Sequence, residues 1–218
     1  MKAGREGIKR ALDLRAHWNE IYSKKQPTEV SWYEPRPAPS LDLIHQANIA
    51  KSDPIIDVGA GSSTLIDSLL AEGYTSLTAL DISCVALQTV KDRLGPKGAD
   101  VRWVEADVTE FVPGQTFSLW HDRAVFHFLV RPIDRMKYRE VLTGSLAPGG
   151  HAVIATFALD GPAQCSGLPV ARYDALGLST ELGPSFELIT SLPHTHLTPW
   201  NAGQSFLYCH FRKRAAFN

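Results

Sequence analysis

Short apolar segments alternate with amphipathic helical segments along most of this 218-residue chain. Each apolar segment has the length of a buried strand, and each helical segment carries its apolar residues on one face. Because a crossover helix between parallel strands must pack on the sheet, this alternation favours a parallel sheet with helices on both faces. The predicted strands cover residues 54–58, 77–80, 101–104, 117–120 and 152–155.

The pattern changes after residue 158, where a loop rich in glycine and proline precedes a short predicted helix at residues 173–182. Two further strand-like segments, at residues 186–192 and 204–212, are close enough in sequence to pair as an antiparallel hairpin. They bring the sheet to seven strands. The sequence therefore predicts a three-layer α/β fold with this hairpin at one edge of the sheet.

Acidic and glycine residues follow the predicted strands, at the edge where an open α/β sheet binds its ligands. Gly59 and Gly61 come directly after the first strand and allow a ligand to approach the backbone, at the start of a helix with free N–H groups. Asp81 ends the second strand and can accept hydrogen bonds from both hydroxyls of a ribose. Asp107 can accept from the amino group of an adenine, while the backbone of Val108 serves a ring nitrogen. These strand ends therefore predict a nucleoside site.

The same residues belong to four motifs that resemble those of the class I S-adenosylmethionine-dependent methyltransferases. The resemblance implies S-adenosylmethionine as cofactor and S-adenosylhomocysteine as product. It also implies a Rossmann-like sheet of strand order 3-2-1-4-5-7-6, with strand 7 antiparallel. The motifs are D-V-G-A-G at 57–61, L-D-I-S at 80–83, E-A-D-V at 105–108 and L-A-P-G-G at 146–150.

By this resemblance Asp57 helps to hold the methionine amino group of the cofactor, and Asp81, with Ile82 beside it, binds the ribose. One departure from the family is Ser63, which stands where a third glycine is usual. A nicotinamide dehydrogenase is the rival interpretation, but its fingerprint needs glycine or alanine at the position that Thr64 occupies. The methyltransferase interpretation is therefore preferred.

An aromatic and proline-rich segment precedes the first predicted strand. Residues 8–24 have the periodicity of an amphipathic helix, and a second helix is predicted to begin at Ser40, a good N-cap residue. We expect residues 1–52 to form a helical lid on a binding domain at residues 53–218, within a single domain overall. The alternative is that the aromatic residues only pack this helix onto the sheet. They are Trp18, Tyr22, Trp32 and Tyr33.

The segment H-D-R-A-V-F-H-F at residues 121–128 follows the fourth strand, where this superfamily places residues that face the acceptor. Its D-R pair, the aromatic lid and the G-P loop after the fifth strand are loosely similar to the thiopurine and related thiol methyltransferases. By that similarity Arg123 contacts the cofactor, and its planar guanidinium suits the methionine carboxylate. The alternative is an ion pair of Arg123 with Asp122 or Asp134. The lid residues assigned to the cofactor by the same similarity are Trp18, Tyr22 and Trp32.

We assign the chemistry to this segment and to the loops expected opposite it. The predicted catalytic residues are Asp122, Arg123 and His127. The predicted acceptor-contacting residues are Tyr33, Phe126, Cys165 and His196. His194 and His196 have the spacing of two metal ligands on one strand face, but no third ligand follows in the sequence, so no metal is expected.

Composition and charge narrow the class of partner. Lys and Arg total 22 against 23 Asp and Glu, and a net charge of −1 gives no positive field to attract nucleic acid. Neither a secretory apolar region nor an apolar run long enough to cross a membrane is present. Three cysteines without metal-like spacing fit a reducing compartment. We expect a cytoplasmic monomer or homodimer that acts on a small molecule.

No residue stands out as an essential base. A thiol has a pKa of about 8.5, so part of it is already thiolate near neutral pH. The sequence therefore favours a small, soft acceptor (a thiol, sulfide or selenol) methylated by in-line displacement. One alternative is a protein lysine N-methyltransferase, because W-x-x-x-Y, found at residues 18–22, also occurs in lysine-methylating relatives. The others are another small molecule with an N or O acceptor, and a silent protein that only binds the cofactor.

Overall fold

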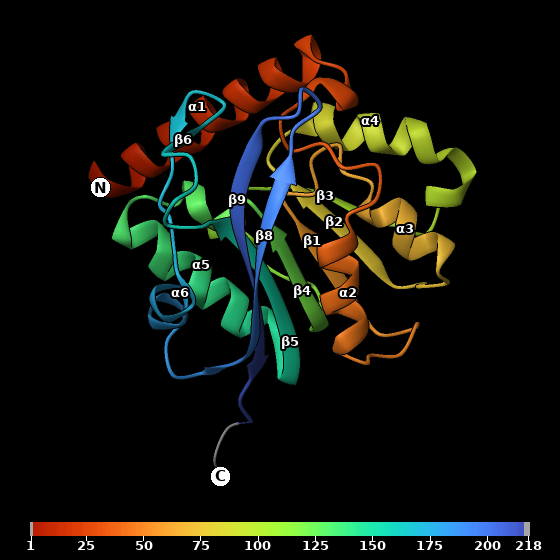
Figure 1. Ribbon diagram of the computed structural model, residues 1–218, viewed down its shortest axis with the longest axis vertical. Coiled ribbons are helices and arrows are strands. Elements are labelled where there is room, and N and C mark those ends of the chain that lie inside the picture. Colours follow the sequence, from red (N-terminus) through yellow and green to blue (C-terminus); the bar gives the residue numbers. More distant parts are fainter. Residues whose placement is uncertain (1, 216–218) are drawn as a thin grey trace.

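The computed structural model describes residues 2–215, which form a seven-stranded sheet between two layers of helices (Figure 1). The strand order is β3-β2-β1-β4-β5-β9-β8, and β9 runs antiparallel to both of its neighbours. Two short strands, β6 and β7, form a separate sheet, so this is the predicted order 3-2-1-4-5-7-6 with the last two strands renumbered. The strands of the main sheet are β1 (Ile55–Val58), β2 (Leu77–Asp81), β3 (Arg102–Glu105), β4 (Phe117–Arg123), β5 (Leu146–Phe157), β8 (Phe186–Leu197) and β9 (Gly203–Lys213).

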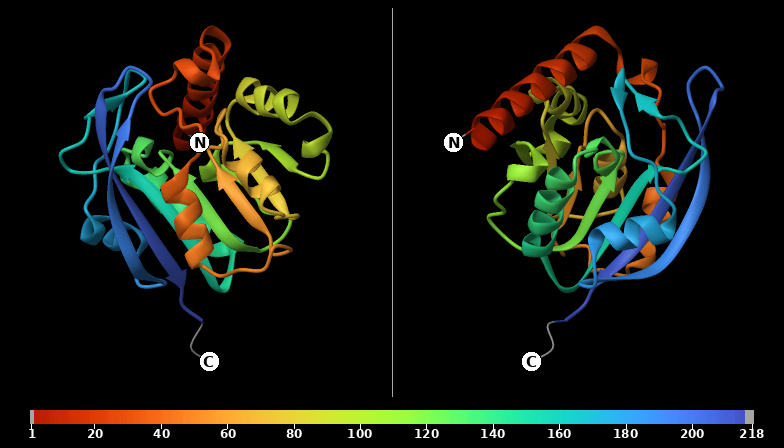
Figure 2. Two further views of the ribbon diagram at one scale, coloured as in Figure 1. Left: turned by 45° about the vertical axis from the view of Figure 1, so that its right-hand side comes forward. Right: turned by 90° about the vertical axis from the view of Figure 1, so that its left-hand side faces the viewer.

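Helices cover both faces of the sheet (Figure 2). On one face α2, α3 and α4 pack on side chains such as Ile55 and Leu119, and on the other α5 and α6 pack on Ile56 and Trp120. Every residue of β1 and β2 is buried, as expected of central parallel strands covered on both faces. The helices are α1 (Lys2–Lys24), α2 (Ala38–Gln46), α3 (Leu65–Ala71), α4 (Cys84–Leu94), α5 (Pro132–Ser145) and α6 (Ala175–Leu182).

Helix α1 lies across the carboxyl ends of the parallel strands (Figure 1). Three side chains attach it there. Arg15 pairs with Glu105 at the end of β3 at 2.8 Å, and Arg10 pairs with Asp134 of α5 at 2.9 Å. Asn19 accepts a hydrogen bond from the hydroxyl of Ser83, which follows β2, at 2.7 Å. Within the predicted lid, α1 therefore covers the strand ends, whereas α2 belongs to the helix layer on the sheet.

Two local predictions are wrong. Ser40 is not the N-cap of α2, because the helix begins at Ala38 after Pro37, and the Ser40 side chain is fully buried in the first turn. The fifth strand, predicted at residues 152–155, is longer, because β5 begins at Leu146 beside a register shift against β4 and includes residues 148–150. Among residues 2–215, no helix combines the length and the apolar character needed to cross a membrane.

Candidate cofactor and acceptor site

A pocket opens at the carboxyl ends of β1, β2 and β4, under α1. The strand ends form one wall, and the chain between Pro27 and Ser40 forms much of the other, with residues of β9. The structure brings together all the residues predicted for the nucleoside site. The lining includes Asp57, Gly59, Gly61, Asp81, Ile82, Asp107 and Val108.

The loop after β1 needs its two glycines. Gly59 and Gly61 have φ of +64° and +52°, a region that disfavours side chains. A Cβ on Gly59 would lie 1.9 Å from Cγ2 of Val125, and one on Gly61 would lie 2.5 Å from the Tyr22 hydroxyl. Ser63 needs no positive φ, so a serine is accepted where the family usually has glycine. The loop is therefore bare backbone where a ligand must come close.

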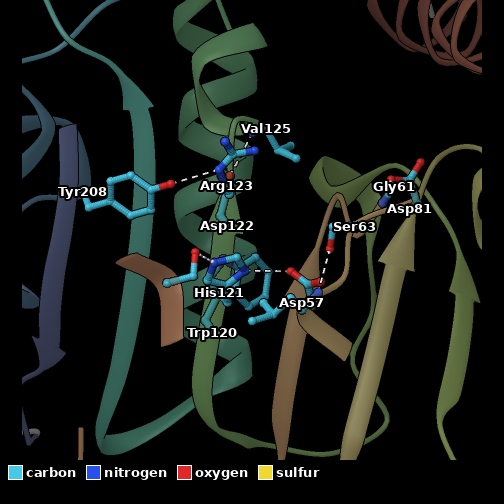
Figure 3. A network of polar contacts seen from close by, with 12 residues as sticks. Asp57, Gly61, Ser63, Asp81, Trp120, His121, Asp122, Arg123, Val125 and Tyr208 are labelled. Atoms are coloured by element: carbon cyan, nitrogen blue, oxygen red, sulfur yellow. Dashed lines mark hydrogen bonds and ion pairs between the residues drawn. The ribbon is translucent and has the colours of Figure 1, made fainter. Parts of the chain in front are cut away.

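Asp81 is held at the end of β2 by backbone groups. Its Oδ2 accepts the Gly61 N–H and its Oδ1 accepts the Ser83 N–H, both at 2.8 Å, as Figure 3 shows for Gly61. Burial raises the pKa of this carboxyl to about 6, against the lowering effect of these hydrogen bonds. The Asp81 carboxylate therefore lies at the end of β2 as a fixed hydrogen-bond acceptor, the group that a ribose hydroxyl requires.

Asp57 presents an unpartnered oxygen at the end of β1. Its Oδ1 lies 2.7 Å from Nδ1 of His121, whereas its Oδ2 is buried without a hydrogen-bond partner. A buried carboxylate oxygen with no partner is costly, and a cationic ligand group removes that cost. The bare glycine loop and this oxygen together fit S-adenosylmethionine, with its ammonium at Asp57 and its ribose at Asp81.

Aromatic rings from the N-terminal segment close the pocket from above. Trp18 contacts Phe128, Trp32 and Tyr22 with ring centroids 5.2, 6.0 and 6.2 Å apart. These rings and Tyr33 all line the pocket. The rings pack on one another and also form the pocket lining. The same contacts therefore serve both roles considered for them, packing and covering the pocket.

Arg123 is the last residue of β4, and its guanidinium donates hydrogen bonds to three other residues of the protein. It donates from Nε to the Tyr208 hydroxyl at 2.9 Å, from Nη1 to the Trp32 carbonyl at 3.0 Å and from Nη2 to Oε1 of Glu34 at 3.1 Å. Its ion-pair partner is therefore Glu34, and neither Asp122 nor Asp134. Arg123 lines the pocket, but these contacts fix the loop before α2 to the sheet.

Asp122 and Arg123 leave β4 on opposite sides, and only Arg123 lines the pocket. Asp122 is fully buried and accepts hydrogen bonds from the Val125 N–H at 2.8 Å and the Tyr138 hydroxyl at 2.6 Å. Burial raises the pKa of Asp122 to about 6. Asp122 thus holds the loop after β4 from outside the pocket lining, and its position lends no support to the catalytic role predicted for it.

His127 and Phe126 also lie outside the pocket lining. Both are fully buried, and burial lowers the pKa of His127 to about 3. The His127 ring packs between Phe128 and Phe157, and its Nδ1 accepts the Phe157 N–H at 3.4 Å. His127 is a neutral imidazole in the core, and Phe126 is a phenyl ring in the core. Neither residue lies where the catalytic or acceptor-contacting role predicted for it would place it.

Of the other three residues predicted to contact the acceptor, two line the pocket and one does not. Tyr33 and Cys165 line the pocket, and burial raises the pKa of the Cys165 thiol. His196 does not line it. Its Nδ1 lies 3.0 Å from Oε1 of Glu34 and its Nε2 lies 2.6 Å from the Ser31 carbonyl, so it binds the residues that form the wall.

Glu34, His121 and Ser40 are pocket residues that the sequence analysis missed. His121 could have been found, because alternation along β4 places it on the same face as Arg123. Glu34 follows an aromatic pair in a proline-rich loop and carries no pattern that marks it. Its Oε2 is buried without a hydrogen-bond partner.

Comparison with known proteins gives a family and several relatives. Residues 55–150 match the family model described as a methyltransferase domain. A mouse protein named eEF1A lysine and N-terminal methyltransferase is 22% identical over 126 residues, which are 57% of this chain but only 18% of that protein. A Danio rerio protein named EEF1A lysine methyltransferase 2 is 22% identical over 199 residues, covering 84% of this chain and 78% of that protein.

The fold also has solved counterparts. Burkholderia thailandensis 1,6-didemethyltoxoflavin-N1-methyltransferase, solved with its substrate and S-adenosylhomocysteine, matches with a TM-score of 0.69 and 20% identity. That match covers 97% of this chain and 90% of the other. The strand order, the strand-end residues and the matched domain agree with one another. The chain therefore carries a region similar to methyltransferase domains, at residues 55–150, within a fold that solved S-adenosylmethionine-dependent methyltransferases share, and S-adenosylmethionine is the cofactor that its strand ends fit.

Proposed function

We propose that the chain methylates an amine, and that the acceptor is a lysine side chain of a protein. The observation that carries this proposal is Glu34, a carboxylate on the pocket wall with one buried oxygen free. An amine or ammonium group donates hydrogen bonds to such an oxygen. A thiolate in the same place would be destabilised by the like charge.

Glu34 stays ionised in this setting. Burial acts to raise its pKa, but the hydrogen bond with His196 and the charge of Arg123 outweigh burial and hold the pKa below the usual value. The group therefore holds and orients an amine at Oε2, and it is a weak acceptor for a proton. S-adenosylmethionine, when bound, supplies the electrophilic methyl group.

Among the described residues, neither arginine of the pocket lining is free to pair with an anionic acceptor. The two arginines of the lining, Arg10 and Arg123, are paired with Asp134 and Glu34. The aromatic rings beside them attract cations by about 0.5–2 kcal/mol each. An amine acceptor therefore suits this wall better than the thiol, sulfide or selenol that the sequence favoured.

The named relatives support the same choice. The mouse and Danio rerio proteins are both named lysine methyltransferases of eEF1A. The mouse match covers under a fifth of that protein, so the name supports a proposal on the acceptor class and on eEF1A as the first protein to test.

The test is methyl transfer from labelled S-adenosylmethionine to a panel of acceptors, with products identified by mass spectrometry. The panel holds purified eEF1A, lysine peptides, small amines, small thiols and sulfide. We expect lysine products, and a loss of about 10- to 100-fold in turnover for Glu34→Gln, as removal of a charged hydrogen bond implies. Glu187→Gln, an exposed glutamate on β8, is the matched control and should behave as the unchanged chain.

The outcomes separate the alternatives. Products on sulfur alone would overturn the amine proposal in favour of the thiol hypothesis. Binding of S-adenosylhomocysteine without transfer to any acceptor would favour the silent protein. Amine products that Glu34→Gln leaves unchanged would remove the observation on which the proposal rests.

A further inference from the structure

A line of largely buried polar side chains runs along the pocket wall from Arg123 to Asp57. Arg123 Nε donates to the Tyr208 hydroxyl at 2.9 Å, and Ser40 is a neighbour of Tyr208. The Ser40 hydroxyl lies 2.9 Å from Nε2 of His121, whose Nδ1 lies 2.7 Å from Oδ1 of Asp57. Figure 3 shows His121 between Asp57 and the α2 segment, with Arg123 and Tyr208 above it.

The carboxylate end of this line fixes its direction, because a carboxylate only accepts hydrogen bonds. Nδ1 of His121 therefore donates to Oδ1 of Asp57, and Nε2, the acceptor nitrogen of the ring, accepts from the Ser40 hydroxyl.

We propose that His121 is a positioning residue for the cofactor, which orients Asp57 so that Oδ2 binds the ammonium of the methionine moiety. Asp57 Oδ2 has no partner of its own, so the group that completes it comes from the ligand. Ser40 acts on the same carboxylate through His121, because its hydroxyl selects the Nδ1–H form of the ring. The proposal concerns cofactor binding alone and does not depend on the acceptor.

A purely structural role is the alternative, because His121 and Ser40 are both buried. The two roles differ in which ligands they affect. Loss of a structural residue weakens every ligand of the pocket. Loss of a residue that orients Asp57 weakens only ligands that carry the amino group.

The experiment measures binding of two ligands by isothermal titration calorimetry. S-adenosylhomocysteine carries the amino acid moiety, and 5′-methylthioadenosine keeps the adenosine and the thioether but lacks it. We expect His121→Leu to weaken S-adenosylhomocysteine about 10-fold or more, and to leave 5′-methylthioadenosine within about twofold. His121→Asn, whose side-chain N–H can take the place of Nδ1–H, should restore most of the affinity.

Ser40→Ala is the second variant and tests the proposal if His121→Leu does not fold. It should weaken S-adenosylhomocysteine about threefold without affecting 5′-methylthioadenosine, as loss of one neutral hydrogen bond implies. Unchanged affinity of a folded variant for S-adenosylhomocysteine would overturn the proposal. An equal loss for both ligands would also overturn it and establish the structural role.

Discussion

His196 and Glu34, 162 residues apart in the sequence, meet at 3.0 Å between Nδ1 and Oε1. The other ring nitrogen lies 2.6 Å from the Ser31 carbonyl. Through these contacts β8 holds the N-terminal loop that forms the acceptor wall.

His196→Ala should therefore loosen this loop. We expect faster amide hydrogen exchange at residues 31–34 and a loss of about 1–3 kcal/mol in the free energy of unfolding. Both are measurable on the protein without ligand. His194→Ala, two residues earlier on β8, removes a ring without these hydrogen bonds and is the control. Equal exchange in the two variants would show that the contact does not hold the loop.

Cofactor affinity should depend on pH through Asp81. Its pKa is raised to about 6, and ribose hydroxyls donate to the ionised form. The affinity for S-adenosylhomocysteine should be constant above pH 7 and should fall as the pH drops through 6, by about tenfold per unit once the carboxyl is mostly protonated. Asp81→Asn should bind weakly at every pH and lack this dependence. The same pH profile in both proteins would assign the titration to another group.

The close contact between Gly59 and Val125 gives a test of the glycine loop. Gly59→Ala meets both a positive φ and a Cβ position 1.9 Å from Val125, whereas Gly73→Ala meets a positive φ with open space around it. The positive φ lowers the free energy of unfolding by about 1–2 kcal/mol in both variants. Overpacking against Val125 lowers it by about 1–3 kcal/mol more at Gly59 alone. Urea unfolding measures the difference, and Val125→Ala in the Gly59→Ala background should recover it. No recovery would mean that the contact is not what limits this position.

Tyr138 joins two buried groups on the core side of β4. Its hydroxyl donates to Oδ2 of Asp122 at 2.6 Å and accepts the Trp120 Nε1–H at 2.9 Å. Tyr138→Phe should cost about 1–3 kcal/mol of stability, because both groups lose a partner in the core. Affinity for S-adenosylhomocysteine should stay close to that of the unchanged chain, since Asp122 lies outside the pocket.

Tyr173→Phe is the control for that measurement, because the Tyr173 hydroxyl makes no protein hydrogen bond among the described residues. A large loss of ligand affinity in Tyr138→Phe with little loss of stability would return Asp122 to the binding machinery.

The nucleoside half of the site could be predicted from the sequence because its residues are local. Asp57 and Asp81 lie at the ends of β1 and β2, Gly59 and Gly61 come just after β1, and the strand order brings the strand ends together. The assignment of Asp122 failed for a local reason too. Successive side chains of a strand point to opposite faces, so Asp122 faces the core when Arg123 faces the pocket.

The acceptor half depends on contacts between distant parts of the chain. Nothing in the sequence around Glu34 or His196 predicts that they meet, because their contact requires β8 to pair with β9 and β9 with β5. For a similar reason, the sequence did not predict that Ser40 is fully buried. Its use as a helix cap is a local preference, which the long-range contact with His121 overrides.

The separation of Glu34 from His196 also fixes an order of assembly during synthesis. A chain emerging from the ribosome releases β1, β2 and β4 well before β8 and β9. The strand ends that bind the nucleoside can thus be translated while Glu34 still lacks its partner. The wall that faces the acceptor is therefore completed last, because the partner of Glu34 lies on β8.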